Sequence, residues 1–215
     1  MQVGICLNMV ARDGLGMAHL PEAAACGFDF VELSAMQVMR LDRQEFTRQV
    51  CRPMQDGGIP CRAMNAFCGT EFRFADPGDA ARVLSYTQEL LDRAAALGAR
   101  VVVIGAGVAR SVAPGESVQA ACAQMTALFC RMAELAAPYG VTLALEGLNR
   151  QETNMYDCMP RVIAQVEACA HPNLGALVDY FHFSLGNESP QILPAMAPQI
   201  RHVHLARVLS RRLPC

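Results

Sequence analysis

Seven short apolar segments recur along the chain, and longer amphipathic segments separate them. This alternation is typical of repeated β-α units, in which parallel strands form a sheet that helices cover. The clearest helical segments are 79–97, with Asp79 as its expected cap and Gly98 at its end, and 117–137. We predict strands at 3–7, 30–33, 61–64, 101–104, 142–146, 176–179 and 202–205.

The connections between these segments are unequal in length. Loop-like stretches, such as 67–78 and 105–115, follow predicted strands, whereas the joins from helix to strand are tight. A barrel whose functional face is built from the loops after its strands has this asymmetry. We therefore expect an α/β fold, a TIM-type (β/α) barrel, forming a single domain over residues 1–215.

An open doubly wound sheet is the alternative fold. Such a sheet normally places a glycine-rich, phosphate-binding turn after its first strand. Gly4 and Gly14 do not have that spacing, and Gly105-Ala-Gly107 lacks the third glycine of the motif. A dinucleotide site is therefore weakly supported.

Composition excludes several classes of function. The formal net charge is −2 and the basic residues are scattered, so the chain offers no cationic surface for nucleic acid. No apolar run approaches the ~18 residues that a membrane-spanning helix needs. The ten cysteines include no Cys-x-x-Cys pair, which favours free thiols in a reducing compartment over a disulfide scaffold. We expect a cytoplasmic enzyme with neither a nucleic-acid partner nor a membrane.

Three predicted strands end on side chains that can bind a metal ion, namely Glu146, Asp179 and His204. A charged residue at a strand end is usually just the first solvated position, so each is weak support on its own. In a parallel barrel, however, the carboxyl ends of all strands share one rim, which brings the three side chains near one point. Two carboxylates and an imidazole suit a divalent ion such as Mn²⁺, Mg²⁺, Co²⁺ or Zn²⁺.

Three motifs near these strand ends resemble a known family. They are Glu146-Gly-Leu-Asn-Arg-x-Glu152, Asp179-x-x-His182 and His202-x-His204 followed by Arg-Arg-x-Pro. Together they resemble the xylose-isomerase-like TIM barrels, and within them the ketose 3-epimerases of the D-tagatose and D-psicose type and the hydroxypyruvate isomerases. The resemblance covers nearly the whole chain.

The resemblance implies a role for each residue of these motifs. Glu146 would be both a metal ligand and the catalytic acid/base, and Asp179 and His204 would complete the ligand set, with Mn²⁺ as the expected ion. The carbonyl and hydroxyl groups of a small sugar substrate would be hydrogen-bonded by Glu152, His182 and Arg211. His202 faces the same side as His204 and is expected to fill the barrel interior.

The chemistry of sugar isomerisation explains these residue types. A proton on a carbon beside a carbonyl is too weakly acidic to leave unaided, and a bound cation stabilises the enediolate that forms. A carboxylate beside that carbon removes the proton. Returning the proton to the adjacent carbon isomerises the sugar, and returning it to the opposite face epimerises it. We therefore predict a metal-dependent isomerase or epimerase of a ketose or small hydroxy-carbonyl compound.

The sequence departs from the family at its C-terminal end. The family places a glutamate, which is the fourth ligand and second base, at the end of an eighth strand, and no counterpart precedes Cys215. We expect an incomplete, C-terminally truncated barrel of about seven strands, with impaired epimerisation and an exposed strand edge that favours a homo-oligomer. One alternative is a catalytically impaired carbohydrate-binding relative. An abasic-site nuclease is another, but it needs more histidine ligands and a basic groove.

Overall fold

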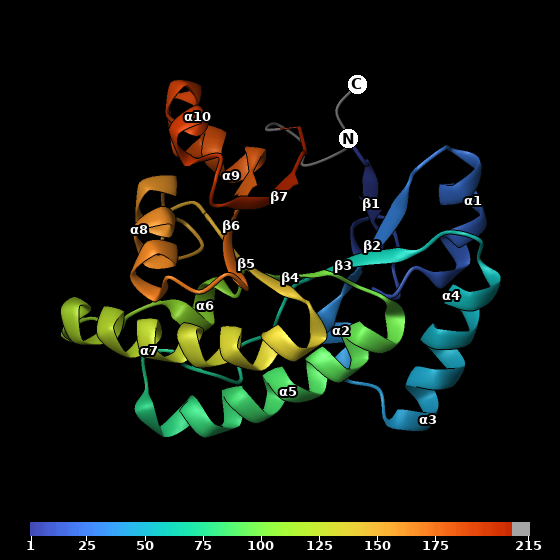
Figure 1. The fold of residues 1–215 in the computed structure, drawn as a ribbon, viewed down its shortest axis with the longest axis horizontal. Coiled ribbons are helices and arrows are strands. Elements are labelled where there is room, and N and C mark those ends of the chain that lie inside the picture. Colours follow the sequence, from blue (N-terminus) through green and yellow to red (C-terminus); the bar gives the residue numbers. More distant parts are fainter. Residues whose placement is uncertain (208–215) are drawn as a thin grey trace.

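The computed structural model describes residues 1–207 and contains one sheet of seven parallel strands (Figure 1). The strands pair in sequential order, so that β1 and β7 form the two edges of the described sheet. The helices lie outside the arc that the strands follow, which is the arrangement of an incomplete (β/α) barrel. The strands are β1 (Gly4–Cys6), β2 (Phe30–Ser34), β3 (Cys61–Asn65), β4 (Val101–Ile104), β5 (Thr142–Glu146), β6 (Leu174–Asp179) and β7 (Ile200–His204).

Ten α-helical segments connect or flank these strands in residues 1–207. A π-helical turn, Thr47–Cys51, joins the third segment to the fourth. The segments are α1 (Leu20–Ala25), α2 (Ala35–Met39), α3 (Arg43–Phe46), α4 (Arg52–Asp56), α5 (Ala80–Leu97), α6 (Gly107–Arg110), α7 (Val118–Ala136), α8 (Met159–Cys169), α9 (Tyr180–Leu185) and α10 (Leu193–Met196).

All seven predicted strands are present, with ends that differ by at most two residues. Helix α5 ends at Gly98, whose φ of 76° is left-handed, as expected for a glycine at this position. Asp79 is at the N-cap position of α5, as predicted, but its side chain forms no capping hydrogen bond. The Asp79 side chain accepts hydrogen bonds from the backbone N–H of Arg73 and from Arg82, and Asp76 caps the preceding 3₁₀ turn through the N–H of Gly78.

The interior of the barrel positions the strand-end side chains. Val103, Ala144 and Leu177 pack against one another inside the sheet, on β4, β5 and β6. Since side chains alternate along a strand, Glu146 and Asp179, two residues further on, point to the same interior side. A larger apolar layer fills the space between the sheet and the helices.

The composition also predicts that the chain has no membrane-spanning helix and that its cysteines are free thiols. Within residues 1–207, no helix is both long and apolar enough to span a bilayer. The nine cysteines of the described chain are free; Cys61 and Cys68 are buried, whereas Cys26 is exposed.

Candidate metal centre

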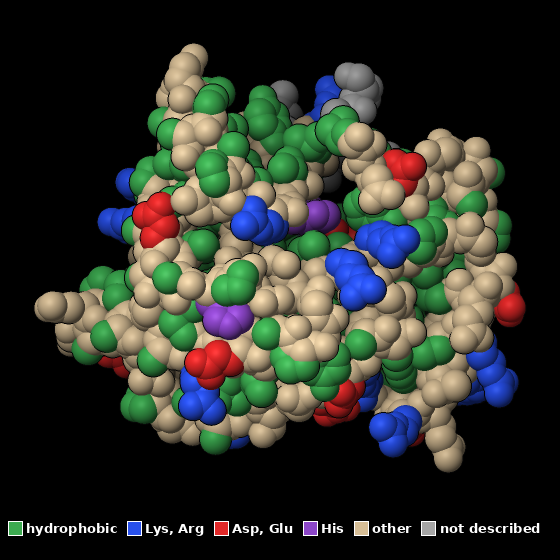
Figure 2. Space-filling model, viewed as in Figure 1, with side chains coloured by type: hydrophobic (Ala, Val, Ile, Leu, Met, Phe, Trp, Pro, Cys, Tyr) green, Lys and Arg blue, Asp and Glu red, His purple; other side chains and the backbone are tan. Residues whose placement is uncertain are grey.

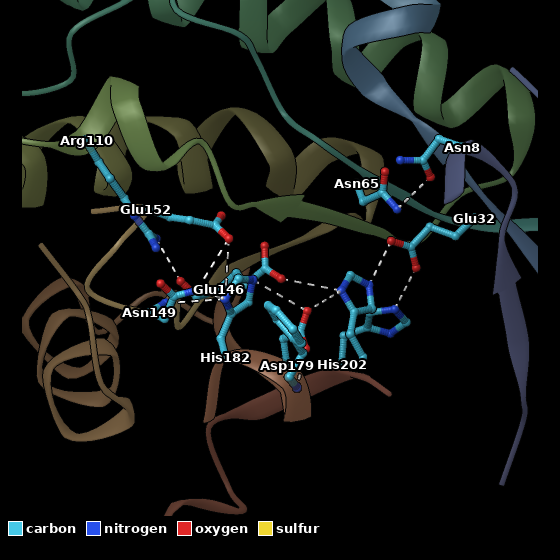
Figure 3. A network of polar contacts seen from close by, with 12 residues as sticks. Asn8, Glu32, Asn65, Arg110, Glu146, Asn149, Glu152, Asp179, His182 and His202 are labelled. Carbon is cyan, nitrogen blue, oxygen red and sulfur yellow. Dashed lines mark hydrogen bonds and ion pairs between the residues drawn. The ribbon is translucent and has the colours of Figure 1, made fainter. Parts of the chain in front are cut away.

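Glu146, Asp179 and His204 converge at the carboxyl ends of β5, β6 and β7 (Figure 3). Asp179 and His204 are register partners in the β6–β7 pair, which places their side chains next to each other. His204 Nδ1 lies 3.5 Å from Glu146 Oε1 and 4.0 Å from Asp179 Oδ2. Ligand atoms that share an ion at ~2.1 Å lie about 3–4 Å apart. The three predicted ligands therefore have a spacing that fits one divalent cation.

The two carboxylate oxygens of Asp179 have different roles, one in capping a helix and one in the site. Oδ1 accepts a hydrogen bond from the backbone N–H of Phe181 at 2.8 Å and so caps α9. Oδ2 remains for the site and lies 3.8 Å from Nε2 of His182. Burial and the negative charge of Glu146 raise the pKa of Asp179 above its usual value. A cation between the two carboxylates would relieve this repulsion.

Glu146 is held ionised by its neighbours. Burial opposes its charge, but the hydrogen bond and charge of His204, and the charges of His182 and Arg110, lower the pKa of Glu146 overall. Arg110, on α6, is fully buried and donates from Nη1 to the backbone carbonyl of Glu146 at 2.7 Å. Burial lowers the pKa of Arg110 to about 10, so its guanidinium stays positive at neutral pH.

Gly105 and Gly107, considered above as part of a phosphate-binding turn, have a steric role in the structure. A β-carbon at Gly105 would lie 2.6 Å from Glu146 Oε2, and one at Gly107 would lie 2.6 Å from the carbonyl oxygen of Glu152. Both glycines thus leave room for the β5 strand end and its loop. Sequence reasoning missed Gly105 and Arg110 as site residues, although the Gly-Ala-Gly run after a strand marked a close backbone approach.

His182 and Glu152, predicted to bind substrate, lie beside this centre. The Asn149 side chain donates to His182 Nδ1 at 2.8 Å, with the Asn149 backbone N–H at 3.4 Å. Because Nδ1 accepts these bonds, the ring proton lies on Nε2, on the side of Asp179. Glu152 Oε1 lies 3.8 Å from His182 Nδ1. Arg211, the third predicted substrate residue, lies outside the described residues.

Glu32 occupies the opposite wall of the site and is buried rather than on the rim. Strand β2 continues to Ser34, and the Glu32 side chain is 2% exposed. Its carboxylate contacts His202 Nε2 at 2.8 Å and His204 Nε2 at 2.9 Å. Burial disfavours the Glu32 charge, but the two imidazoles outweigh it and lower the pKa of Glu32 to about 2. Although burial acts in the other direction, Glu32 and Glu146 raise the pKa of His204 well above its usual value.

Polar side chains from β1 and β3 extend this wall. Asn65 donates to the side-chain oxygen of Asn8 at 3.1 Å, and its own oxygen has no hydrogen-bond partner within residues 1–207. Cys6 forms a second metal-competent group with Glu32 and His204. Burial and the Glu32 charge raise the pKa of the Cys6 thiol, which is therefore neutral. Phe67 is fully buried in the core.

The imidazole side of the site is partly exposed in the described part of the chain. A histidine side chain is visible in a hollow between the region of β7 and the region of β1 and β2 (Figure 2). The side chains of His202 and His204 are 15% and 16% exposed.

Comparison with known proteins decides the family. The xylose isomerase-like TIM barrel family matches residues 20–215. The chain belongs to this family. A ketose 3-epimerase from Arthrobacter globiformis is 29% identical over 187 residues, which cover 83% of this chain and 61% of that protein. An L-ribulose 3-epimerase from Methylomonas sp. (strain DH-1) is 23% identical over 185 residues, covering 85% of this chain and 63% of that protein.

Solved structures agree on the fold. A D-psicose 3-epimerase crystallised in the presence of D-fructose superposes with a TM-score of 0.79 at 20% identity, covering 96% of this chain and 73% of the other. The chain spans less than two thirds of the length of the two curated 3-epimerases. The sequence matches make the chain a relative of ketose 3-epimerases.

Proposed function

We propose that this protein is a metal-dependent isomerase or epimerase of a ketose or a small hydroxy-carbonyl compound. The observation that carries the proposal is the convergence of Glu146, Asp179 and His204, with His204 Nδ1 3.5 Å and 4.0 Å from the two carboxylates. The matched 3-epimerases act on sugars, which supports a small sugar as the substrate. A divalent ion held by these three residues, Mn²⁺ in our proposal, would polarise the substrate carbonyl and stabilise the enediolate.

Glu146 is the proposed base. It is ionised, since His204, His182 and Arg110 lower its pKa against the effect of burial. It also projects into the barrel, where the absence of a side chain at Gly105 leaves space beside its Oε2. An ionised carboxylate in this position can take the proton from the carbon next to the carbonyl and return it.

His182 and Glu152 are the proposed substrate-binding residues of the described chain. The Asn149 contacts are made to Nδ1 of His182, so the Nε2–H lies on the side of Asp179 and can donate to a sugar oxygen there. The Glu152 side chain is 40% exposed and lies at the mouth of the same site, where it can accept from a hydroxyl group. Asn65 offers an acceptor on the opposite wall through its side-chain oxygen, which has no hydrogen-bond partner in the described part of the chain.

Deuterium exchange tests this proposal. Chelator-treated protein is reloaded with Mn²⁺ and incubated in D₂O with D-psicose, D-fructose, D-tagatose, L-ribulose or hydroxypyruvate. Mass spectrometry then measures deuterium in recovered substrate and product. We expect metal-dependent exchange with at least one compound, reduced by roughly 10²–10⁴-fold in Glu146→Gln. Glu134→Gln, an exposed carboxylate on α7 paired with Arg131, is the matched control and should exchange like the parent.

Two results would contradict the proposal. Undiminished exchange in Glu146→Gln would remove Glu146 from the role of base. Binding of a sugar to the metal-loaded protein without any exchange would instead identify a carbohydrate-binding relative.

A further inference from the structure

Glu32 holds two imidazoles at once, and this arrangement fixes where their protons lie. Its Oε2 is 2.8 Å from His202 Nε2 and its Oε1 is 2.9 Å from His204 Nε2. An ionised carboxylate only accepts hydrogen bonds, so both Nε2 atoms must be the donors. Each oxygen of Glu32 is therefore engaged by one ring N–H.

The consequence for His204 concerns its other nitrogen. A neutral imidazole carries one proton, and a proton held on Nε2 leaves a lone pair on Nδ1. Nδ1 is the atom that faces Glu146 Oε1 and Asp179 Oδ2. When His204 binds a cation through Nδ1, the ring therefore keeps its Nε2 proton, and this N–H donates a hydrogen bond to Glu32.

We propose that Glu32 is a positioning residue of the metal centre, which fixes the tautomer and ring orientation of His204 so that Nδ1 can serve as a ligand. This inference rests on the metal site of the proposed function and adds a residue that the strand-end motifs do not contain. Carboxylates that accept the second N–H of a metal-binding histidine typically change metal affinity 10–100-fold when removed.

Two other roles for Glu32 are less consistent with the geometry. As a base, it would need a free oxygen, and both of its oxygens already accept hydrogen bonds. As a direct ligand, it would act with Cys6 and the same His204. In that case His204 would have to give up its Nε2 proton, and the neutral thiol of Cys6 would have to ionise.

Metal affinity measured on a set of variants separates these roles. Mn²⁺ binding to the full chain is followed by electron paramagnetic resonance of the free ion, with circular dichroism to verify folding. Glutamine offers a single acceptor that can serve either ring, so both Glu32→Gln and Glu32→Ala are needed. We expect both variants to bind Mn²⁺ roughly 10–100-fold more weakly than the parent. Cys6→Ser tests the direct-ligand alternative and should retain the parental affinity. Glu134→Gln, at an exposed carboxylate on α7, is the control and should also retain it.

A second measurement reports the tautomer itself. Histidine ¹⁵N NMR of the Zn²⁺-loaded protein, which is diamagnetic, should show a protonated Nε2 on His204 in the parent and in Cys6→Ser. In folded Glu32→Gln and Glu32→Ala the ring is no longer held, so part of the Zn²⁺ should bind through Nε2 instead, and the His204 ring proton should then appear partly on Nδ1. A purely structural contact between β2 and β7 would change stability without changing this spectrum.

The outcomes distinguish this inference from the proposed site. Unchanged Mn²⁺ affinity and His204 signals in both Glu32 variants, with binding abolished in Asp179→Ala, would overturn the role of Glu32 and leave the site intact. Undiminished binding in Asp179→Ala would overturn the site itself. Loss of Mn²⁺ binding in Cys6→Ser would place the ion in the group of Cys6, Glu32 and His204 and would also overturn the inference.

Discussion

Gly105 Cα faces the carboxylate of Glu146 so closely that a β-carbon there would lie 2.6 Å from Glu146 Oε2. The contact joins the end of β4 to the end of β5, and it leaves the proposed base without a neighbouring side chain on that side. Because the clash would be with the reactive end of Glu146, even a methyl group must displace the carboxylate.

We therefore expect Gly105→Ala to fold but to bind Mn²⁺ at least roughly tenfold more weakly, as in the loss of a group that orients a ligand. Gly186→Ala is the matched control, since its β-carbon would meet only ordinary contacts at 3.4–3.5 Å. Calorimetric titration with Mn²⁺ measures both. Equal affinity in the two variants would show that the Glu146 carboxylate does not need the space beside Gly105.

The two carboxylate oxygens of Asp179 have different roles, and two substitutions can separate them. Asp179→Ala and Asp179→Asn both remove the charge and should both abolish Mn²⁺ retention, measured by elemental analysis after dialysis. Asparagine keeps an oxygen that can accept from the Phe181 N–H, whereas alanine does not. Loss of such a cap costs about 1 kcal/mol, so urea denaturation of the metal-free proteins should find Asp179→Ala less stable than Asp179→Asn by that amount. Equal stabilities would exclude the capping role.

The ionised Glu32 carboxylate should make the free energy of unfolding decrease at acidic pH. Its pKa is lowered from 4.5 to about 2 in the folded protein. A lowered carboxyl pKa contributes stability that is present above pH ~4.5 and is lost as the pH falls toward ~2, here on the order of 3 kcal/mol. Between pH 5.5 and 3, the free energy of unfolding of the metal-free parent should therefore fall more than that of Glu32→Gln, which cannot titrate. Parallel pH profiles would show that the folded protein does not stabilise the Glu32 charge.

The buried guanidinium of Arg110 should be more important for the position of Glu146 than for the stability of the fold. It donates to the Glu146 carbonyl and lies 5.8 Å from the Tyr156 ring centroid, while its Nε and Nη2 have no hydrogen-bond partner within residues 1–207. A buried charge costs desolvation energy, so Arg110→Met, which keeps the volume, should lie within ~1.5 kcal/mol of the parent. Arg110→Ala also leaves a cavity and should lose about 3 kcal/mol in denaturant titrations. Equal losses would show that the cation itself stabilises the fold.

The strands and the three converging strand ends could be predicted from sequence because both follow from local patterns. Apolar runs identify strands, and parallel strands bring their carboxyl ends to one rim. These two patterns predict that Glu146, Asp179 and His204 lie together, as they do in the structure. Composition also favoured free thiols, and the nine cysteines of the described residues are free.

The remaining features depend on contacts between distant residues. Glu32 reaches His204 across 172 positions of sequence, and only the curvature of the sheet shows that β2 and β7 face each other. Arg110 looked like an ordinary helix residue, yet it is fully buried beneath β5. The Asp79 side chain does not cap α5, because its carboxylate accepts hydrogen bonds from the backbone N–H of Arg73 and from the Arg82 side chain. Propensity at a helix start does not reveal such tertiary partners.

The central claim, that three adjacent strand ends form one metal centre, is tested most directly by crystals of the Mn²⁺-loaded protein. Anomalous diffraction collected above and below the manganese absorption edge locates the ion without prior assumptions. The account predicts one strong peak about 2.0–2.4 Å from Glu146, from Asp179 Oδ2 and from Nδ1 of His204, with Nε2 of His204 still against Glu32. A peak between Cys6, Glu32 and Nε2 of His204, or no peak near these strand ends, would contradict it.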